Sequence, residues 1–265
     1  MKPHLLFRIG QVIIFIFFIS SCTPHFYQPK PLEPVLLTNA DQLKINIVSD
    51  KNMTAVSAAY SPNTNVGLTA GIASHRNKTI GSDNSGQEKI LLDEHYFSPY
   101  VGVGYFKHFS ENFLFETYAG AGMYTYKNNA VSYLKNMKNI NLFIQPSIAY
   151  VNDYFDAAFT IRVDYLNRGT TIIKDSVLSQ DDQKKYKFLD YKSYLFAQPG
   201  ITIRAGFKYV KFQFQISQSI PFNNKYKSVY GYGSRFLLDP YEDRNHVVIG
   251  IGISGEINNV FKKKK

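Results

Sequence analysis

Several residue patterns in the chain could carry chemistry. The string Gly250-Ile251-Gly252-Ile253-Ser254-Gly255 has the glycine spacing of a dinucleotide-binding loop. That loop needs a helix directly after the glycines, because the helix N-terminus holds the pyrophosphate. No helical pattern follows residue 255, and the segment itself alternates as a strand would. We therefore interpret these glycines as strand positions that leave room for a close neighbour.

Two groups of acidic residues and histidine could support acid–base catalysis. They are Asp93, Glu94 and His95, and Asp239, Glu242, Asp243 and His246. Such catalysis needs two of these side chains within hydrogen-bond reach of each other. No recognisable motif surrounds either group, so we predict no catalytic residues and a protein that is not an enzyme. His25, His75 and His108 lack metal-ligand spacing, so no metal site is predicted and no cofactor other than covalent lipid.

Cys22 is the only cysteine, which excludes an internal disulfide, and it follows a segment with the features of an export signal. Lys2 and Arg8 precede the apolar run 12–19, which is too short for a membrane-spanning helix. The run Ile19-Ser20-Ser21-Cys22 resembles the lipobox of bacterial lipoproteins. The resemblance implies cleavage before Cys22, with diacylglycerol on its sulfur and an acyl chain on its amino group. Each buried methylene of such chains contributes about 0.8 kcal/mol to membrane anchoring.

Segments of other composition flank the main body. Residues 1–21 are predicted to be the signal peptide, and residues 22–41 a lipidated periplasmic linker that is extended by Pro24, Pro29, Pro31 and Pro34. Residues 259–265 end in Lys262 to Lys265 and form a basic periplasmic tail. This tail would contact anionic headgroups, peptidoglycan or a protein, or would simply be solvated. The net charge of +10 suits nucleic acid, but export excludes that partner.

The body, residues 42–258, alternates apolar residues with a period of two, which is typical of strands. Its composition is apolar and aromatic: the whole chain has 45% hydrophobic, 15% aromatic and only 19% charged residues. Ten runs show the pattern: 42–48, 53–61, 65–74, 96–106, 113–126, 141–151, 156–165, 194–207, 210–219 and 246–257.

The two faces of these runs differ in kind. The apolar faces, such as Phe212, Phe214 and Ile216, carry no charged residue, whereas the other faces hold Gly, Ser, Thr, Gln and Tyr. The polar face of a soluble sheet would be rich in Lys and Glu. A closed barrel in a bilayer is apolar outside and polar inside. We therefore predict an all-β fold, an antiparallel up-and-down transmembrane barrel of ten strands. Eight strands, or a soluble periplasmic sandwich or lipocalin-like barrel, are the alternatives.

Connection lengths agree with this barrel. Short connections at 62–64, 107–112, 152–155 and 208–209 alternate with long ones at 75–95, 127–140, 166–193 and 220–245. Short turns of outer-membrane barrels face the periplasm, so both ends of the body are predicted at that rim. Pro99, Pro146 and Pro199 fall on apolar faces inside predicted strands, where each removes a ladder hydrogen bond. These prolines keep the eight-stranded alternative open.

Charged residues on the inward faces predict a filled interior. They are Lys44, Glu116, Arg162, Asp164, Arg204, Lys211 and Glu256. Unpaired charges are costly in a medium of low dielectric constant, so we predict a plug of ion pairs. Ten strands enclose little more space than eight, whose inward side chains fill the interior. A conducting pore lined by the same residues is the alternative.

The lipidated start, the Pro-rich linker, the meander of strands and the aromatic content together resemble the small outer-membrane barrel lipoproteins of Bacteroidota. The resemblance implies a structural or accessory subunit of a larger envelope complex for secretion, barrel assembly or uptake. Its partners would be outer-membrane lipid and another envelope protein. Residues 23–27 lack the acidic cluster that is associated with surface export in that group. This implies a lipid anchor in the periplasmic leaflet and extracellular long loops. There are two alternatives. One is a barrel enzyme, either a protease or a lipid-modifying enzyme, with a loop-borne site. The other is a narrow channel.

Overall fold

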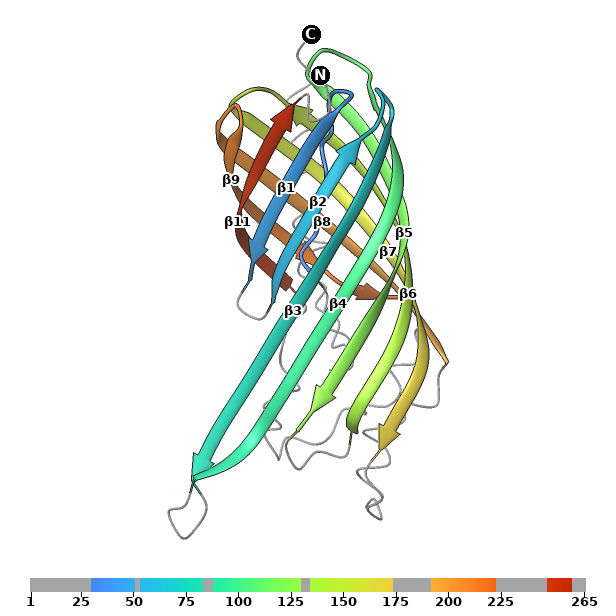
Figure 1. Ribbon diagram of the computed structural model, residues 1–265, viewed down its shortest axis with the longest axis vertical. Helices are drawn as coiled ribbons and strands as arrows, with labels where there is room; N and C mark the ends of the chain where they lie inside the picture. The colour runs from blue at the N-terminus through green and yellow to red at the C-terminus, as the bar shows by residue number, and fades with distance from the viewer. Residues whose placement is uncertain are drawn as a thin grey trace, which may run out of the picture.

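The computed structural model describes residues 30–50, 53–82, 88–129, 134–173, 192–222 and 247–258. The predicted signal peptide, Cys22 and the basic tail lie outside these residues. Within the described ranges, no helix is long and apolar enough to cross a membrane. All regular structure there is β (Figure 1): β1 (Gln42–Ser49), β2 (Thr54–Ser61), β3 (Val66–Ser82), β4 (Glu88–His108), β5 (Phe113–Asn128), β6 (Leu134–Val151), β7 (Phe155–Ile173), β8 (Ser193–Phe207), β9 (Val210–Gln218), β10 (Ile220–Pro221) and β11 (Val247–Asn258).

The strands form one closed antiparallel barrel. Consecutive strands pair from β1 to β9, and β9 then pairs with β11, which pairs with β1 and closes the ring. The two-residue β10 pairs with β8 beyond the end of β9. The predicted all-β, ten-stranded up-and-down barrel is therefore confirmed, and the eight-stranded alternative is wrong.

The alternation predicted from the sequence divides the wall into two faces. Apolar side chains cover the outer face: Val101, Phe212 and Ile251 are 63%, 68% and 67% exposed. The inner face buries polar side chains, and Glu116 and Gln215 are 0% exposed. A soluble barrel would place polar side chains outside and apolar ones inside. The single closed ring also shows that the sandwich alternative is wrong.

The two ends of the barrel differ in their connections and in how far the strands extend. Turns at 62–65, 109–112, 152–154 and 208–209 define the short-turn end, and the opposite end is called the long-loop end. Strands β3 to β7 extend well beyond β1, β2 and β11 at the long-loop end (Figure 1). The predicted bounds of the long connections were wrong, because most of 75–95 and 127–140 and part of 166–193 belong to strands. Pairing continues there after the apolar alternation has faded, since backbone hydrogen bonds do not need it.

The three prolines on the outer face each interrupt one ladder. Pairing between β4 and β5 skips Pro99, pairing between β6 and β7 skips Pro146, and pairing between β8 and β9 begins just after Pro199. Each proline still pairs with the strand on its other side. The register is the same before and after the gaps at Pro99 and Pro146, so no bulge is needed. Proline lacks only its own N–H, so the cost falls on one neighbour.

Candidate functional site

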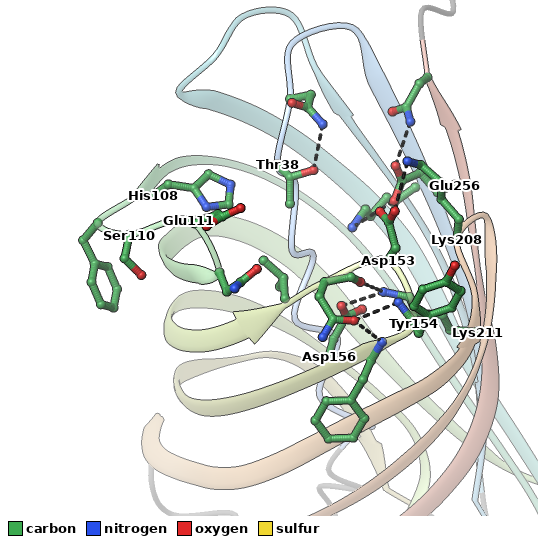
Figure 2. Close-up of a pocket in the computed structure, with 18 residues that line it drawn as sticks. Thr38, His108, Ser110, Glu111, Asp153, Tyr154, Asp156, Lys208, Lys211 and Glu256 are labelled. Atoms are coloured by element: carbon green, nitrogen blue, oxygen red, sulfur yellow. Dashed lines mark hydrogen bonds and ion pairs between the residues drawn. The ribbon is translucent and has the colours of Figure 1, made fainter. Parts of the chain in front are cut away.

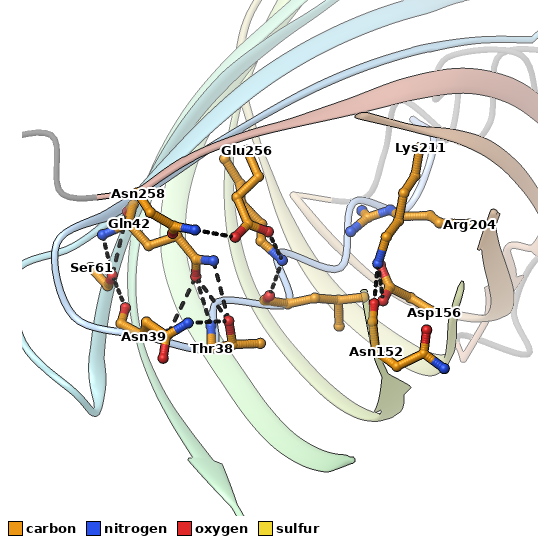
Figure 3. Close-up of polar contacts among 12 residues, drawn as sticks. Thr38, Asn39, Gln42, Ser61, Asn152, Asp156, Arg204, Lys211, Glu256 and Asn258 are labelled. Atoms are coloured by element: carbon orange, nitrogen blue, oxygen red, sulfur yellow. Dashed lines mark hydrogen bonds and ion pairs between the residues drawn. The ribbon is translucent and has the colours of Figure 1, made fainter. Parts of the chain in front are cut away.

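Residues 30–37, called here the lumenal segment, run inside the barrel before the chain turns into β1 (Figures 1 and 3). Every residue of the segment is buried. This differs from the linker outside the barrel that its prolines suggested. An extended, proline-containing chain has backbone groups that no helix or sheet satisfies, and the inward polar side chains of the barrel bond to them.

Glu116 on β5 binds the backbone of the lumenal segment. Its two carboxylate oxygens accept hydrogen bonds from the amides of Val35 at 2.9 Å and Leu36 at 2.7 Å. A carboxylate that accepts two backbone N–H groups forms charge-assisted bonds, which are the stronger kind. Glu116 therefore fixes the depth of the segment in the lumen.

The carbonyls of the lumenal segment receive donors from several strands. Gln198 donates to Lys30 O at 2.9 Å, Gln145 to Glu33 O at 3.1 Å, Arg204 to Pro34 O at 2.6 Å and Lys44 to Leu36 O at 2.5 Å. The Gln215 amide, oriented with its nitrogen toward Leu32, donates to Leu32 O at 2.6 Å and accepts from Leu32 N at 3.1 Å. The barrel thus recognises the backbone of this segment from β1, β5, β6, β8 and β9.

The apolar side chains of the segment pack against the inner wall. Val35, Leu36 and Leu37 belong to one buried cluster with side chains of β2 and β4 to β7, including Tyr118. Two glycines make room for this packing. A side chain at Gly200 would place its first carbon 2.5 Å from Leu32 Cδ1, and one at Gly67 would lie 2.8 Å from Leu37 Cδ1. A first side-chain carbon would also meet the wall, 2.3 Å from the Tyr118 hydroxyl at Gly67 and 2.6 Å from Ser217 Cβ at Gly200. Glycine therefore lets the wall and the segment approach each other closely at these positions.

The inward charges form pairs in part. Lys44 lies 3.3 Å from Glu256, and Arg162 lies 2.8 Å from Asp164. Lys211 pairs at 2.7 Å with Asp156, which the sequence analysis did not single out. Of the predicted plug residues, Glu116, Arg204 and Lys44 bind the lumenal segment. Sequence reasoning missed the segment itself, because its burial depends on the barrel and leaves no local periodicity.

A boundary of aromatic rings lies at the deep end of the lumenal segment. Lys30 Nζ lies 4.1 Å from the Tyr100 ring centre, and the Arg162 guanidinium lies 3.9 Å from that of Phe143. Tyr100 also donates a hydrogen bond to the Glu33 carboxylate. Cations over ring faces gain electrostatic stabilisation where water is excluded. These contacts hold the deep end of the segment.

Beyond this boundary, toward the long-loop end, the interior is aromatic. Tyr96 lies 4.9 Å from Tyr126 and 6.0 Å from Tyr124 between ring centres. These rings share a buried cluster with Met53, Ala55, Ala73, Met137, Leu166, Tyr194 and Phe196. This half of the lumen is therefore filled largely by side chains of the wall.

A polar pocket of about 1080 Å³ opens at the short-turn end (Figure 2). It is lined by the turns and by Thr38 and Asn39, where the lumenal segment meets the rim. The charged groups of this pocket include paired ones: Lys208 lies 3.2 Å from Asp153. The hydrogen bond and charge of Asp153 raise the pKa of the Lys208 ammonium. These two groups thus neutralise each other at the rim.

Of the candidate catalytic residues, Asp93, Glu94 and His95 lie in the described part of the chain. Asp93 lies 3.5 Å from Arg76, and Glu94 accepts a hydrogen bond from Tyr126 at 2.8 Å. Both are buried on β4, as is neighbouring His95 in part, and none lies in a loop. Residues 239–246 lie outside the described part of the chain. The described residues contain no group of three His, Cys, Asp or Glu able to hold a metal.

The glycines of the dinucleotide-like string lie in strand β11, as the sequence interpretation expected. A side chain at Gly252 would place its first carbon 2.2 Å from the carbonyl oxygen of Ile47 on β1. These glycines therefore permit close strand packing. No protein-family model matches the chain, and no curated protein is significantly similar to it. The functional argument thus depends on the geometry of the barrel and its lumen.

Proposed function

We propose that this chain is a non-catalytic outer-membrane lipoprotein, a barrel sealed by its own lumenal segment that serves as a structural or accessory subunit of a larger envelope complex. The observation that carries the proposal is the occupied lumen. A barrel whose interior is filled and bonded to its own backbone acts through its outer wall and its rims.

The outer face supports a bilayer location. The apolar belt on β4 lies between His95 and Lys107, which are twelve residue steps apart in sequence. At about 3.4 Å per residue and a tilt of about 40°, this distance corresponds to a height of about 31 Å. That height encloses an apolar band of about 25 Å. A charge in the middle of such a band would cost about 2–4 kcal/mol, and charged outward side chains lie at its margins, for example Arg76 and Lys138.

The filled lumen disfavours conduction. An ion would have to displace a segment that is held by Glu116, Arg204 and Lys44, and each buried group left unpaired would cost about 1–3 kcal/mol. The enzyme alternative has less support, because Asp93 and Glu94 are already paired with neighbours on the strands.

The extension of β3 to β7 is the surface that we assign to an envelope partner. Beyond the end of β2, residues 76–82 of β3 pair with β4 on one side, and no second strand pairs with them in the described ranges. Exposed strand edges can accept a further strand from another protein. Arg76 and Lys78 are exposed there, which favours an acidic partner segment and discourages self-association.

The proposal is tested by isolating the full chain from its native membrane in mild detergent. We expect a stoichiometric protein partner that is lost in the Arg76→Glu/Lys78→Glu variant and retained in Lys208→Glu, which changes the opposite end of the barrel. We also expect no ion conductance in planar bilayers. A chain that stays monomeric without detergent would refute the membrane assignment. A barrel that is always isolated alone would refute the accessory role.

A further inference from the structure

We infer that the lumenal segment carries the N-terminal part of the chain across the barrel, so that the lipid on Cys22 enters the membrane leaflet at the long-loop end. This inference rests on the proposed membrane location and reverses the leaflet that the sequence suggested. Its basis is the path of the described residues 30–38 and the covalent length of the chain that precedes them.

The contacts of the segment give its direction. Thr38 lies at the short-turn end, where its amide donates to the Gln42 side chain at 2.7 Å. Toward the N-terminus, Pro34 contacts Arg204, Leu32 lies against Gly200, and Lys30 contacts Gln198. Positions 204, 200 and 198 lie progressively farther along β8 from its short-turn end at Phe207. The chain therefore goes deeper into the barrel as it is followed back from Thr38 to Lys30.

The depth of Lys30 follows from strand geometry. Gln198 precedes Phe207 by nine residue steps, which is about 30 Å along β8 and about 23 Å of height at a tilt of about 40°. The apolar band of an outer-membrane barrel is about 25 Å high. Lys30 thus lies roughly one band height away from the short-turn rim.

The chain before Lys30 is too short to return to that rim and reach the bilayer. Eight residue steps join Lys30 to Cys22, and they span at most about 27 Å when fully extended. A return would use nearly all of this length, leave nothing for a turn or for passage around the rim, and need space beside the lumenal segment, which packs against the wall. Travel onward to the long-loop leaflet requires much less length.

The long-loop end also offers a low point in the wall. β1 and β2 have eight residues each, whereas β3 has 17 and β4 has 21 (Figure 1). Seven residue steps of β1 correspond to about 18 Å of height at the same tilt, so β1 ends no higher than Lys30. Acyl chains attached to Cys22 could pass over β1 and β2 into the adjoining leaflet without crossing the wall.

The side of the membrane can be tested with short epitope tags in the producing bacterium. One tag is inserted between His25 and Phe26, a second between residues 182 and 183, and a third after Lys265. We expect the first two tags to bind antibody on intact cells and the third to bind only after permeabilisation. A tag at 25 that behaves like the C-terminal tag would overturn the inference. Failure of the tag at 182 as well would instead count against the proposed orientation of the barrel.

A cross-link tests the path itself if a tag disturbs folding. A photo-reactive leucine analogue at position 32 should cross-link to β8 in native membranes, because Leu32 lies directly against the Gly200 backbone. In the matched control the same analogue replaces Leu142, which is exposed on the outer face of β6 and should not cross-link to β8. A membrane-inserted barrel without the first cross-link would show that the segment does not occupy the lumen.

Discussion

The two halves of the lumen are filled in different ways. Near the short turns, polar and charged side chains of the wall bond to the backbone of residues 30–37. Near the long loops, rings such as Tyr96 and Tyr126 meet one another directly. The small and polar inward side chains of the first half do not fill the lumen by themselves. The lumenal segment fills the remaining space. Large rings fill the same width without such a segment.

The difference teaches that one alternating pattern supports two kinds of interior. In the polar half, removing a hydrogen-bonding group should matter more than removing volume, because its partner would stay buried and unpaired. In the aromatic half, volume should matter more, because dispersion contacts supply the stabilisation. The following four changes test this contrast.

Deletion of residues 30–37 should have the largest effect. It would leave Glu116, Arg204 and Lys44 without their contacts to the segment, at a cost of about 1–3 kcal/mol for each buried group. We expect a much lower midpoint of urea unfolding in detergent. Ion conductance in planar bilayers should stay absent, because wall side chains fill the aromatic half without the segment. A deletion variant with an unchanged unfolding midpoint would mean that the contacts to the segment contribute nothing to stability.

Met137→Ala tests volume in the aromatic half. Met137 is 1% exposed in the cluster that contains the tyrosines, and its truncation should lower the free energy of unfolding by about 2–5 kcal/mol. Met137→Leu conserves the volume and should cost less than about 1.5 kcal/mol. Urea unfolding in detergent measures both changes. Equal losses in the two variants would contradict a volume-dominated half.

Glu116→Gln tests hydrogen bonding in the polar half at almost constant volume. One carboxylate oxygen becomes an amide nitrogen, so the amide of Val35 or of Leu36 loses its acceptor. We expect a loss of about 1–3 kcal/mol in the free energy of unfolding. Met137→Leu also conserves volume and should cost less. The ratio of the two losses in free energy of unfolding therefore compares the two halves directly. An unchanged free energy of unfolding in Glu116→Gln would mean that packing alone stabilises the polar half.

Lys208→Ala at the rim should have the smallest effect, with no measurable change in the unfolding midpoint near neutral pH, because the ion pair is exposed. Asp153 raises the pKa of Lys208, so any contribution of the pair is complete below the unfolded-state pKa. It is lost as the pH rises through the folded-state pKa. Unfolding curves at neutral and alkaline pH for the variant and the parent measure this difference. A clear loss at neutral pH would show that the rim, too, is built on electrostatics.

The sequence predicted the wall much better than its contents. The period of two identified ten strands and their outward faces, because alternation is a local signal. It did not predict the extensions of β3 to β7, where pairing depends on neighbouring strands and not on apolar residues. The prolines raised doubt about the strand count, because a strand inside a sheet pairs on both sides. Only the structure shows that each proline interrupts the pairing on one side of its strand.

The contents of the lumen could not be read from local patterns. Lys44 with Glu256 and Lys211 with Asp156 are brought together by closure of the ring and by strand register across several residues. Residues 30–37 resemble a linker in composition, and their burial depends on cavities that segments far along the chain create. The alternation thus predicted which charged residues face inward, but it did not predict their partners or the chain segment that lies among them.

The seam between β1 and β11 has a consequence for biogenesis. The first and last strands of the ring pair over eight residues, from Gln42 with Asn258 to Ser49 with Ile251. Synthesis must therefore reach the final strand before the cylinder can shut, and contacts this distant in sequence form slowly. Only residues 38–41 separate the lumenal segment from β1, so the segment stays beside this seam while the barrel closes. If the segment enters before closure, any factor that catalyses closure has to accept an open barrel that already holds it.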